Sequence, residues 1–205
     1  MDLSIPKDKM PYAVGTVYII DDDHFMSNMI KEALLTEGYH VFNFETSAAF
    51  FQAEIHQPGV LILDMMLHSD TGVQVQAKLV NLNIDIPIVF ISGDSTAGQS
   101  VLAMKQGAID FLIKPFELED LLLSVEKAFE TQIIKLNDHI IQKRRDQKLQ
   151  KLTKRELQVY HLLLKSYNNT EIMETLKISM ITTKQYKRQV MQKLEVITRS
   201  QLVNL

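Results

Sequence analysis

Four short apolar runs, each followed at once by a polar side chain, constrain the fold of this chain more than any other feature. The runs and their polar ends occupy residues 17–22, 60–64, 88–92 and 109–115. Continuous apolar runs of this length are typical of strands that are buried on both faces of a parallel sheet. Because the carboxyl ends of parallel strands meet at one crevice, the polar ends are expected to lie together. The pattern therefore predicts a small site with three carboxylates, a hydroxyl and an ammonium group.

Amphipathic stretches separate these runs in the first 130 residues. A further strand is expected over residues 39–44, and Ser47 is the expected cap of the helix that follows it. Helices are expected after Asp23 and over residues 48–55, 73–82 and 96–106. Strands that alternate with helices predict an α/β fold with a five-stranded, doubly wound parallel sheet.

A long helix is predicted over residues 117–150, which contain neither proline nor glycine. Apolar residues recur in it at spacings of three and four, namely Leu118, Leu122, Val125, Phe129, Ile133, Leu136 and Ile140. This stripe is expected to pack on the sheet at first and then to need another partner. That partner is either a second chain, in a coiled-coil-like contact, or the chain's own domains. Residues 143–145 are interpreted as a solvated turn at the end of this helix.

Residues 148–205 lack the alternation typical of strands and predict helices alone. Candidate helix caps follow one another along this segment: Thr153 with Glu156 in a capping box, Asn168 or Asn169, Ser179, and Thr198 or Ser200. The second and third of these helices are separated only by a short turn around residues 177–179. Two helices joined in this way predict a small all-α domain with a helix-turn-helix.

Charge divides the chain in the same place as the helical pattern. Residues 16–130 carry 17 acidic and 5 basic side chains, whereas residues 148–205 carry 4 acidic and 11 basic ones. This asymmetry indicates two domains with different partners, the second of them nucleic acid. The absence of cysteine excludes disulfides and thiolate chemistry. Because neither a signal-peptide pattern nor a bilayer-spanning apolar segment is found, we expect a cytoplasmic protein without membrane contact.

The predicted crevice has the chemistry of phosphoryl transfer. Clustered carboxylates from Asp21, Asp22 and Asp64 repel one another unless a cation lies among them, and oxygen-only ligands suit Mg²⁺. Asp64 stands alone at its strand end and is the candidate nucleophile, with an aspartyl phosphate as the product. Ser92 and Lys114 offer a hydroxyl and an ammonium to the phosphoryl oxygens. Each residue alone would be an ordinary helix cap or turn, so the prediction depends on their combination.

Residues 16–130 resemble the receiver domain of two-component response regulators, which has a flavodoxin-like fold. The resemblance depends on the motifs Ile20-Asp21-Asp22, Leu63-Asp64, Gly72, Ile91-Ser92-Gly93 and Lys114-Pro115-Phe116. It implies that Asp64 accepts phosphate from a sensor histidine kinase. It also implies that Mg²⁺ is held by Asp21, Asp22, Asp64 and the backbone carbonyl of Met66.

The same resemblance assigns the parts that respond to phosphate. Ser92 and Phe111 would form a switch pair, in which the hydroxyl moves toward the phosphate and the aromatic ring turns inward. Lys114 would pair with the phosphoryl group, and the peptide bond before Pro115 would be cis. The chain departs from the family at His68, where proline is frequent, and we therefore expect the segment that begins there to be looser.

Residues 150–205 resemble the LuxR-type output domain of FixJ-like and NarL-like regulators. The motifs are Leu152-Thr153-Lys154-Arg155-Glu156, Asn169-Thr170-Glu171-Ile172, Leu176-Lys177-Ile178-Ser179, Thr182-Thr183-Lys184 and Lys193-Leu194. They imply a recognition helix in the major groove of double-stranded DNA. Transferred by position, the residues that would face bases are Lys184, Gln185 and Arg188, and those that would face phosphates are Ser179, Thr182 and Lys187.

Four residues depart from the LuxR-type pattern. Thr170 stands where the family commonly has lysine, Met173 where it has alanine, Thr183 where it has valine and Tyr186 where it has histidine. Thr170 removes a phosphate contact, and Met173 must fit where helices usually approach closely. DNA binding is therefore expected to be weaker than usual or to have unusual specificity.

Together these patterns predict a response regulator with four parts: an N-terminal extension (1–15), a receiver domain (16–130), a linker helix (131–149) and a DNA-binding domain (150–205). It would accept a phosphoryl group and hydrolyse it again, without being an enzyme in the usual sense, and would bind DNA as a homodimer. The alternative is a phosphorylation-controlled adaptor that binds protein instead of DNA. An aspartyl-phosphate phosphatase is disfavoured, because Met66 occupies the place of its second acid.

Overall fold

The computed structural model describes residues 15–93 and 97–203. The chain forms two compact units, and the division between them falls between Lys135 and Leu136. Apart from Gly15, the predicted N-terminal extension lies outside the described residues. Within the described ranges, no helix has the length and apolar character needed to cross a lipid bilayer.

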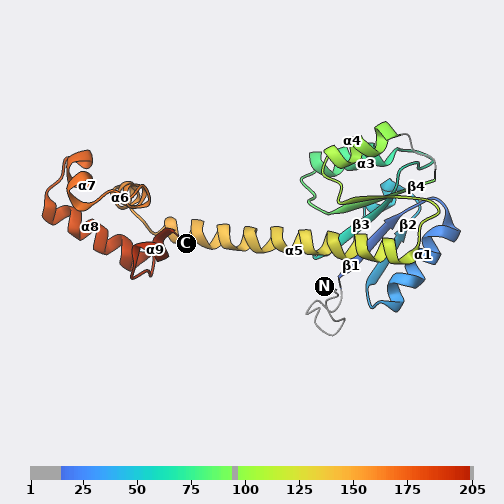
Figure 1. Ribbon diagram of the computed structural model, residues 1–205, viewed down its shortest axis with the longest axis horizontal. Coiled ribbons are helices and arrows are strands. Elements are labelled where there is room, and N and C mark those ends of the chain that lie inside the picture. The colour runs from blue at the N-terminus through green and yellow to red at the C-terminus, as the bar shows by residue number, and fades with distance from the viewer. Residues whose placement is uncertain (1–14, 94–96, 204–205) are drawn as a thin grey trace, which may run out of the picture. The chain divides into compact units, whose positions relative to one another are not determined.

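A parallel sheet forms the centre of the first unit (Figure 1). Its strands are β1 (Thr16–Ile20), β2 (His40–Phe44), β3 (Gly59–Asp64), β4 (Ile88–Ser92) and β5 (Asp110–Ile113). They lie in the order β2-β1-β3-β4-β5, and every neighbouring pair is parallel. The order changes direction at β1 and β3, where a sheet of this kind leaves a crevice at its carboxyl edge. The predicted five-stranded, doubly wound sheet is confirmed.

Helices cover both faces of this sheet. Successive residues of a strand point to opposite faces, so apolar strands make both faces apolar and both must be buried. The helices of this unit are α1 (His24–Thr36), α2 (Ser47–Phe50), α3 (Gly72–Asn81), α4 (Ala97–Lys105) and the first part of α5 (Leu118–Leu149). Tyr18 and Ile20 pack in one buried cluster with residues of α2, α3 and α4. Val17 and Ile19 pack in a second cluster with residues of α1 and α5. Burial on both faces explains why the strands are apolar throughout.

Helix α2 differs from its prediction in both length and cap. It ends at Phe50 instead of continuing to residue 55. Its cap is Thr46, whose hydroxyl accepts the N–H of Ala49, and not Ser47. The hydroxyl of Ser47 donates instead to the carboxylate of Asp70, which is 23 positions away in the sequence.

Helix α5 is continuous from Leu118 to Leu149, so the interpretation of residues 143–145 as a turn is wrong. Its buried side is also rotated from the predicted stripe and consists of Leu121, Ser124, Val125, Ala128, Phe129 and Gln132. Leu118, which was expected to pack on the sheet, is 47% exposed. Gln132 is buried because its Oε1 accepts the backbone N–H of Gly59 at 2.6 Å, a contact that hydrophobic spacing cannot reveal.

The second unit is helical, as predicted. Besides the end of α5 it contains α6 (Lys154–Leu164), α7 (Asn169–Leu176), α8 (Met180–Lys193) and α9 (Arg199–Val203). Their shared core consists of Val159, Tyr160, Leu163, Ile172, Val190, Leu194 and Leu202. The predicted capping box of Thr153 and Glu156 is confirmed, as is Ser179 as the cap of α8. Asn168, rather than its neighbour, caps α7.

Candidate functional site

Three carboxylates meet at the carboxyl edge of the sheet. Asp21 and Asp22 follow β1, and Asp64 ends β3, which pairs directly with β1. Each offers an oxygen, and these three oxygens lie within 4.8 Å of one another. Asp21 and Asp64 are buried and Asp22 is half-buried, so their charges are held close together and mostly away from solvent. The structure thus brings together the acidic residues that the strand ends predicted.

Lys114, which follows β5, points into the same cluster. Its Nζ donates to Oδ2 of Asp64 at 2.6 Å and to Oδ2 of Asp21 at 2.9 Å. Burial alone would lower the pKa of Lys114, but its hydrogen bonds to Asp64 and Asp21 outweigh burial and raise the pKa. Burial raises the pKa of the Asp21 carboxyl, against the opposing effect of the bonds from Lys114 and from the backbone N–H of Asp23. One ammonium therefore offsets part of a larger negative charge.

The backbone around Asp64 is tightly packed. The N–H of Met66 donates to Oδ1 of Asp64 at 2.9 Å, so each of the two oxygens of Asp64 has a donor. Gly72 opens α3 beside this segment, and a Cβ there would lie 2.7 Å from the carbonyl oxygen of Asp64 and 2.7 Å from the ring of Phe90. This close approach explains why the receiver motif has glycine at this position.

Several contacts hold the loop after Asp64, where the departure from the family pattern at His68 led us to expect a looser segment. The backbone N–H of His68 donates to Oδ2 of Asp22 at 2.7 Å, and its ring Nδ1 contacts the same oxygen. The N–H of Leu67 also donates to the carbonyl of Asp70 at 3.0 Å. Both the neighbouring strand end and the loop itself therefore hold this segment.

The predicted switch residues lie on the two strands beyond β3. Ser92 ends β4 and is fully buried, and its Oγ has no hydrogen-bond partner among the described residues. Phe111 on β5 is half-buried and packs on Phe90, with ring centroids 6.1 Å apart. The bond between Lys114 and Pro115 is cis, as the resemblance implied. A buried hydroxyl without a partner can accept a new contact at little cost, because it breaks none.

The donor set of the crevice fits a hard divalent cation. It consists of carboxylate oxygens, with the backbone at Met66 alongside, and it contains no sulfur. Oxygen ligands of this kind suit Mg²⁺, which keeps several waters and needs only one or two carboxylates from the protein. The adjacent Asp23 is directed elsewhere, since its Oδ1 accepts the N–H groups of Phe25 and Met26 and caps α1.

The second unit contains a helix-turn-helix built from α7 and α8. Lys177 ends α7 in a left-handed conformation with φ 52°, which turns the chain sharply before α8 begins. Of the side chains expected to face DNA bases, Lys184, Gln185 and Arg188 are all exposed on α8. Lys187 is half-buried, and its Nζ donates to the side chain of Asn169 at 3.4 Å.

The start of α8 is held by a small hydroxyl network. The hydroxyls of Ser179 and Thr182 are 2.8 Å apart, and Ser179 Oγ also accepts the N–H of Thr182. Thr183, where the family commonly has valine, is fully buried, and its hydroxyl donates to the carbonyl of Ser179 at 3.0 Å. This bond satisfies the extra polar group, so the substitution is accommodated inside the helix.

Comparison with known proteins assigns both units. Residues 17–126 match the response regulator receiver domain family, and residues 150–205 match the bacterial regulatory proteins of the LuxR family. The chain belongs to the two-component response regulators. It combines a receiver domain with a LuxR-type DNA-binding domain, and its relatives are transcriptional response regulators.

Relatives of this response regulator match it over nearly the whole chain. The response regulator protein TmoT of Ectopseudomonas mendocina is 33% identical over 193 residues, which are 93% of this chain and 87% of TmoT. The transcriptional regulatory protein FixJ of Rhizobium meliloti is 30% identical over 192 residues, which are 93% and 94% of the two chains. Among solved structures, the response regulator StyR is 32% identical with a TM-score of 0.79, covering 94% of this chain and 98% of StyR.

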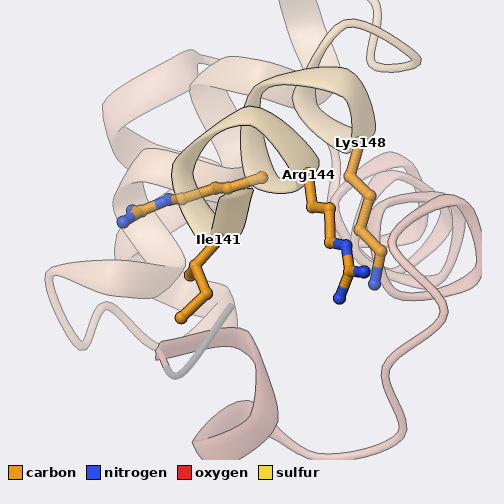
Figure 2. Close-up of a pocket in the computed structure, with 4 residues that line it drawn as sticks. Ile141, Arg144 and Lys148 are labelled. Carbon is orange, nitrogen blue, oxygen red and sulfur yellow. The ribbon is translucent and has the colours of Figure 1, made fainter. Parts of the chain in front are cut away.

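A basic hollow lies at the end of α5 in the second unit of this response regulator. It is lined by Ile141, Arg144, Arg145 and Lys148, and Figure 2 shows Arg144 and Lys148 projecting side by side from successive turns. Arg145 donates to the hydroxyl of Tyr160 at 3.3 Å, and Lys148 donates to the carbonyl of Leu194 at 3.4 Å. These bonds attach the last turns of α5 to the output domain.

Sequence reasoning missed two contacts among the clustered carboxylates of this response regulator. The first is the backbone hydrogen bond and ring contact from His68 to Asp22, for which the only sequence signal was a residue with a backbone N–H where the family has proline. The second is the hydrogen bond from the N–H of Met66 to Asp64. The resemblance implied a role for the carbonyl of Met66 but none for its N–H. Both contacts come from the loop after β3, whose path the strand pattern does not define.

Proposed function

We propose that Asp64 is the phosphoacceptor of this response regulator and receives its phosphoryl group from a sensor histidine kinase. In this step a carboxylate oxygen of Asp64 forms a bond to phosphorus, and the bond between phosphorus and the kinase histidine breaks. The observation that carries the proposal is the ammonium of Lys114, held 2.6 Å from the Asp64 carboxylate at the edge of the sheet. That ammonium can move with the new charge and pair with a phosphoryl oxygen.

Asp21, Asp22, Asp64 and the backbone carbonyl of Met66 would hold Mg²⁺ in this site. When bound, the cation neutralises charge on the carboxylates and on the phosphoryl oxygens. Asp21 is 1% exposed, and its bonds from Lys114 and from the N–H of Asp23 fix its orientation. We also infer that the receiver itself eventually hydrolyses the phosphate.

Ser92 and Phe111 would report the phosphate to the rest of the domain. The Oγ of Ser92 has no partner among the described residues, so a phosphoryl oxygen on Asp64 would give it one. Movement of this hydroxyl would leave room for the half-buried ring of Phe111 to turn inward. The face that includes α4 and β5 would change with it, and we infer that this change promotes a homodimer.

The output domain would bind double-stranded DNA through α8. Lys184, Gln185 and Arg188 would face base edges in the major groove, and their exposure supports this role. Ser179, Thr182 and Lys187 would contact phosphates. A dimer would match two half-sites about one helical turn apart. Because such a regulator acts on the chromosome, we propose that the protein is cytoplasmic. We also propose that residues 16–130 form the receiver domain, 131–149 the linker helix and 150–205 the DNA-binding domain.

Phosphorylation is tested by incubating the full chain with Mg²⁺ and a small phosphodonor and then measuring its intact mass. Wild type is expected to gain one phosphoryl group, and Asp64→Ala is expected to gain none. Asp85→Ala is a matched control, because Asp85 is an exposed carboxylate that pairs with Lys135. Labelling that persists in Asp64→Ala would assign the phosphate to another residue.

DNA binding is tested by gel shift with genomic fragments over a series of salt concentrations. Binding that strengthens with phosphorylation and weakens steadily with salt is expected. If no salt-sensitive binding is found with or without phosphorylation, the adaptor alternative takes its place, and partners are then sought among proteins.

A further inference from the structure

His68 makes two contacts in the receiver domain that the usual residue of its position cannot make. Its backbone N–H donates to Oδ2 of Asp22 at 2.7 Å, and its ring Nδ1 contacts the same oxygen. The receiver resemblance places proline here, and proline has neither a backbone N–H nor a ring nitrogen that can donate. Both contacts are therefore departures of this chain from the family pattern.

The donors of the crevice are divided among its carboxylates. Lys114 donates hydrogen bonds to Asp21 and Asp64, which lie deeper in the cluster. His68 contacts Asp22 instead. The side chain of Asp22 is 17% exposed, and that of His68 is 88% exposed. The ring thus stands at the solvent side of the crevice and holds the outermost of the three carboxylates.

We propose that His68 is a positioning residue for the cation: its two donors fix Oδ2 of Asp22 and leave Oδ1 to bind Mg²⁺. The inference rests on the proposed magnesium site. A carboxylate that is already held by a neighbour loses less freedom when it binds a metal, and partners of this kind typically change metal affinity by about 10–100-fold. His68 would therefore raise the affinity of this receiver for Mg²⁺ without touching the ion.

Three substitutions in the full-length chain separate the two donors. His68→Ala keeps the backbone N–H and loses the imidazole, His68→Gln adds a side-chain amide that can donate in its place, and His68→Pro loses both donors. The dissociation constant for MgCl₂ is measured by isothermal titration calorimetry without any phosphodonor. Wild type and His68→Gln are expected to bind most tightly, His68→Ala about 10-fold more weakly and His68→Pro more weakly still.

His24→Ala is the matched control. His24 pairs with Glu45 at 3.0 Å on the surface, so it is a histidine–carboxylate pair that includes none of the three clustered carboxylates. Its substitution is expected to leave Mg²⁺ affinity unchanged. Thermal unfolding of every variant in Mg²⁺-free buffer separates a general loss of structure from a change at the site. Rescue of Mg²⁺ affinity by His68→Gln is a second control, since a purely structural role of His68 would not predict it.

Each result decides the inference. Equal Mg²⁺ affinity in wild type, His68→Ala and His68→Pro would overturn it, and so would tighter binding by His68→Ala, since the imidazole would then compete with the cation. The same titrations with MnCl₂ test direct ligation. If His68→Ala loses far more affinity for Mn²⁺ than for Mg²⁺, the ring nitrogen of His68 binds the metal directly and the positioning role is wrong. Absence of Mg²⁺ binding by wild type would overturn the magnesium site itself and this inference with it.

Discussion

The ammonium of Lys114 donates to the carboxylate of Asp64 at 2.6 Å, although 50 positions separate the two residues in the sequence. The same ammonium donates to Asp21, so it joins the ends of two adjacent strands. Its raised pKa keeps it charged at neutral pH, where it offsets part of the negative charge of the cluster. Removal of this charge should therefore affect stability as well as phosphate sensing.

Lys114→Met is expected to destabilise the receiver domain by about 3 kcal/mol in Mg²⁺-free buffer, because it leaves the buried carboxylates without the ammonium group that offsets their charge. Added Mg²⁺ should restore more stability to this variant than it adds to wild type, since the cation replaces the missing charge. Urea unfolding followed by circular dichroism, with and without excess Mg²⁺, measures both effects. Lys135→Met removes an exposed bond to Asp85 and should cost less than about 1 kcal/mol. Equal losses in the two variants would contradict this account.

Gly72→Ala is expected to destabilise the receiver domain by about 1–3 kcal/mol, since its Cβ would overpack a full space. The methyl group would lie 2.7 Å from the carbonyl oxygen of Asp64, and relief of that clash would move Asp64 itself. Gly93→Ala is the control, because a Cβ at Gly93 meets no atom of the described residues within 4 Å. Urea unfolding measures stability, and the rate of phosphorylation should fall in the first variant only. A stable, fully reactive Gly72→Ala would show that the loop yields easily.

The strand pattern was sufficient to predict the sheet and the carboxylate cluster. Apolar runs define strands, and a parallel sheet allows their carboxyl ends to meet in one place, so Asp21, Asp64 and Lys114 followed from local sequence and one rule of topology. Helix caps such as Thr153 and Ser179 were equally accessible, because the cap bonds lie within four residues of one another.

Contacts between residues far apart in the sequence explain what could not be predicted. The buried side of α5 includes Gln132, which bonds to the backbone of Gly59, whereas spacing rules treat glutamine as a surface residue. Ser47 failed as a cap because its hydroxyl bonds to Asp70. The contact of His68 with Asp22 could not be predicted, because the two residues are 46 positions apart.

The pairing of Glu156 predicts a loss of stability in acid. This carboxylate is 2% exposed; burial acts to raise its pKa, but bonds from Lys193 Nζ at 2.7 Å and from the N–H of Thr153 at 2.6 Å lower it overall. A carboxyl with a lowered folded pKa contributes stability above its unfolded pKa of about 4.3, and this contribution disappears as pH falls through the folded value. The output domain should therefore weaken below about pH 4.3.

Glu156→Gln tests this linkage. It should cost about 1–3 kcal/mol at neutral pH, because it leaves Lys193 without its charged partner. The difference from wild type should shrink as pH falls, since wild type then loses the same contact. Hydrogen exchange of α6 in the full chain measures local stability at each pH. A difference that stays constant down to pH 3 would place the titrating group elsewhere.

Thr170→Lys is expected to strengthen DNA binding, because it restores a cation that the LuxR-type pattern has at the start of α7. Thr170 is exposed, and Lys187 Nζ already lies 3.4 Å from the side chain of the neighbouring Asn169. A lysine at position 170 would thus add charge beside an expected phosphate contact. Each added phosphate contact should steepen the plot of log affinity against log salt by about 0.9. The helix dipole opposes this lysine by only about 0.3–1 kcal/mol.

Two further variants show whether the change in slope reports phosphate contacts. Lys187→Ala should make the slope shallower by about 0.9, which is the opposite of the effect of Thr170→Lys. Lys105→Ala removes an exposed cation from α4 of the receiver domain and should leave the slope unchanged. Gel shifts over a salt series, at equal phosphorylation, give all three slopes. If Thr170→Lys raises affinity with no change in slope, the gain comes from helix packing, and the start of α7 does not lie against the DNA backbone.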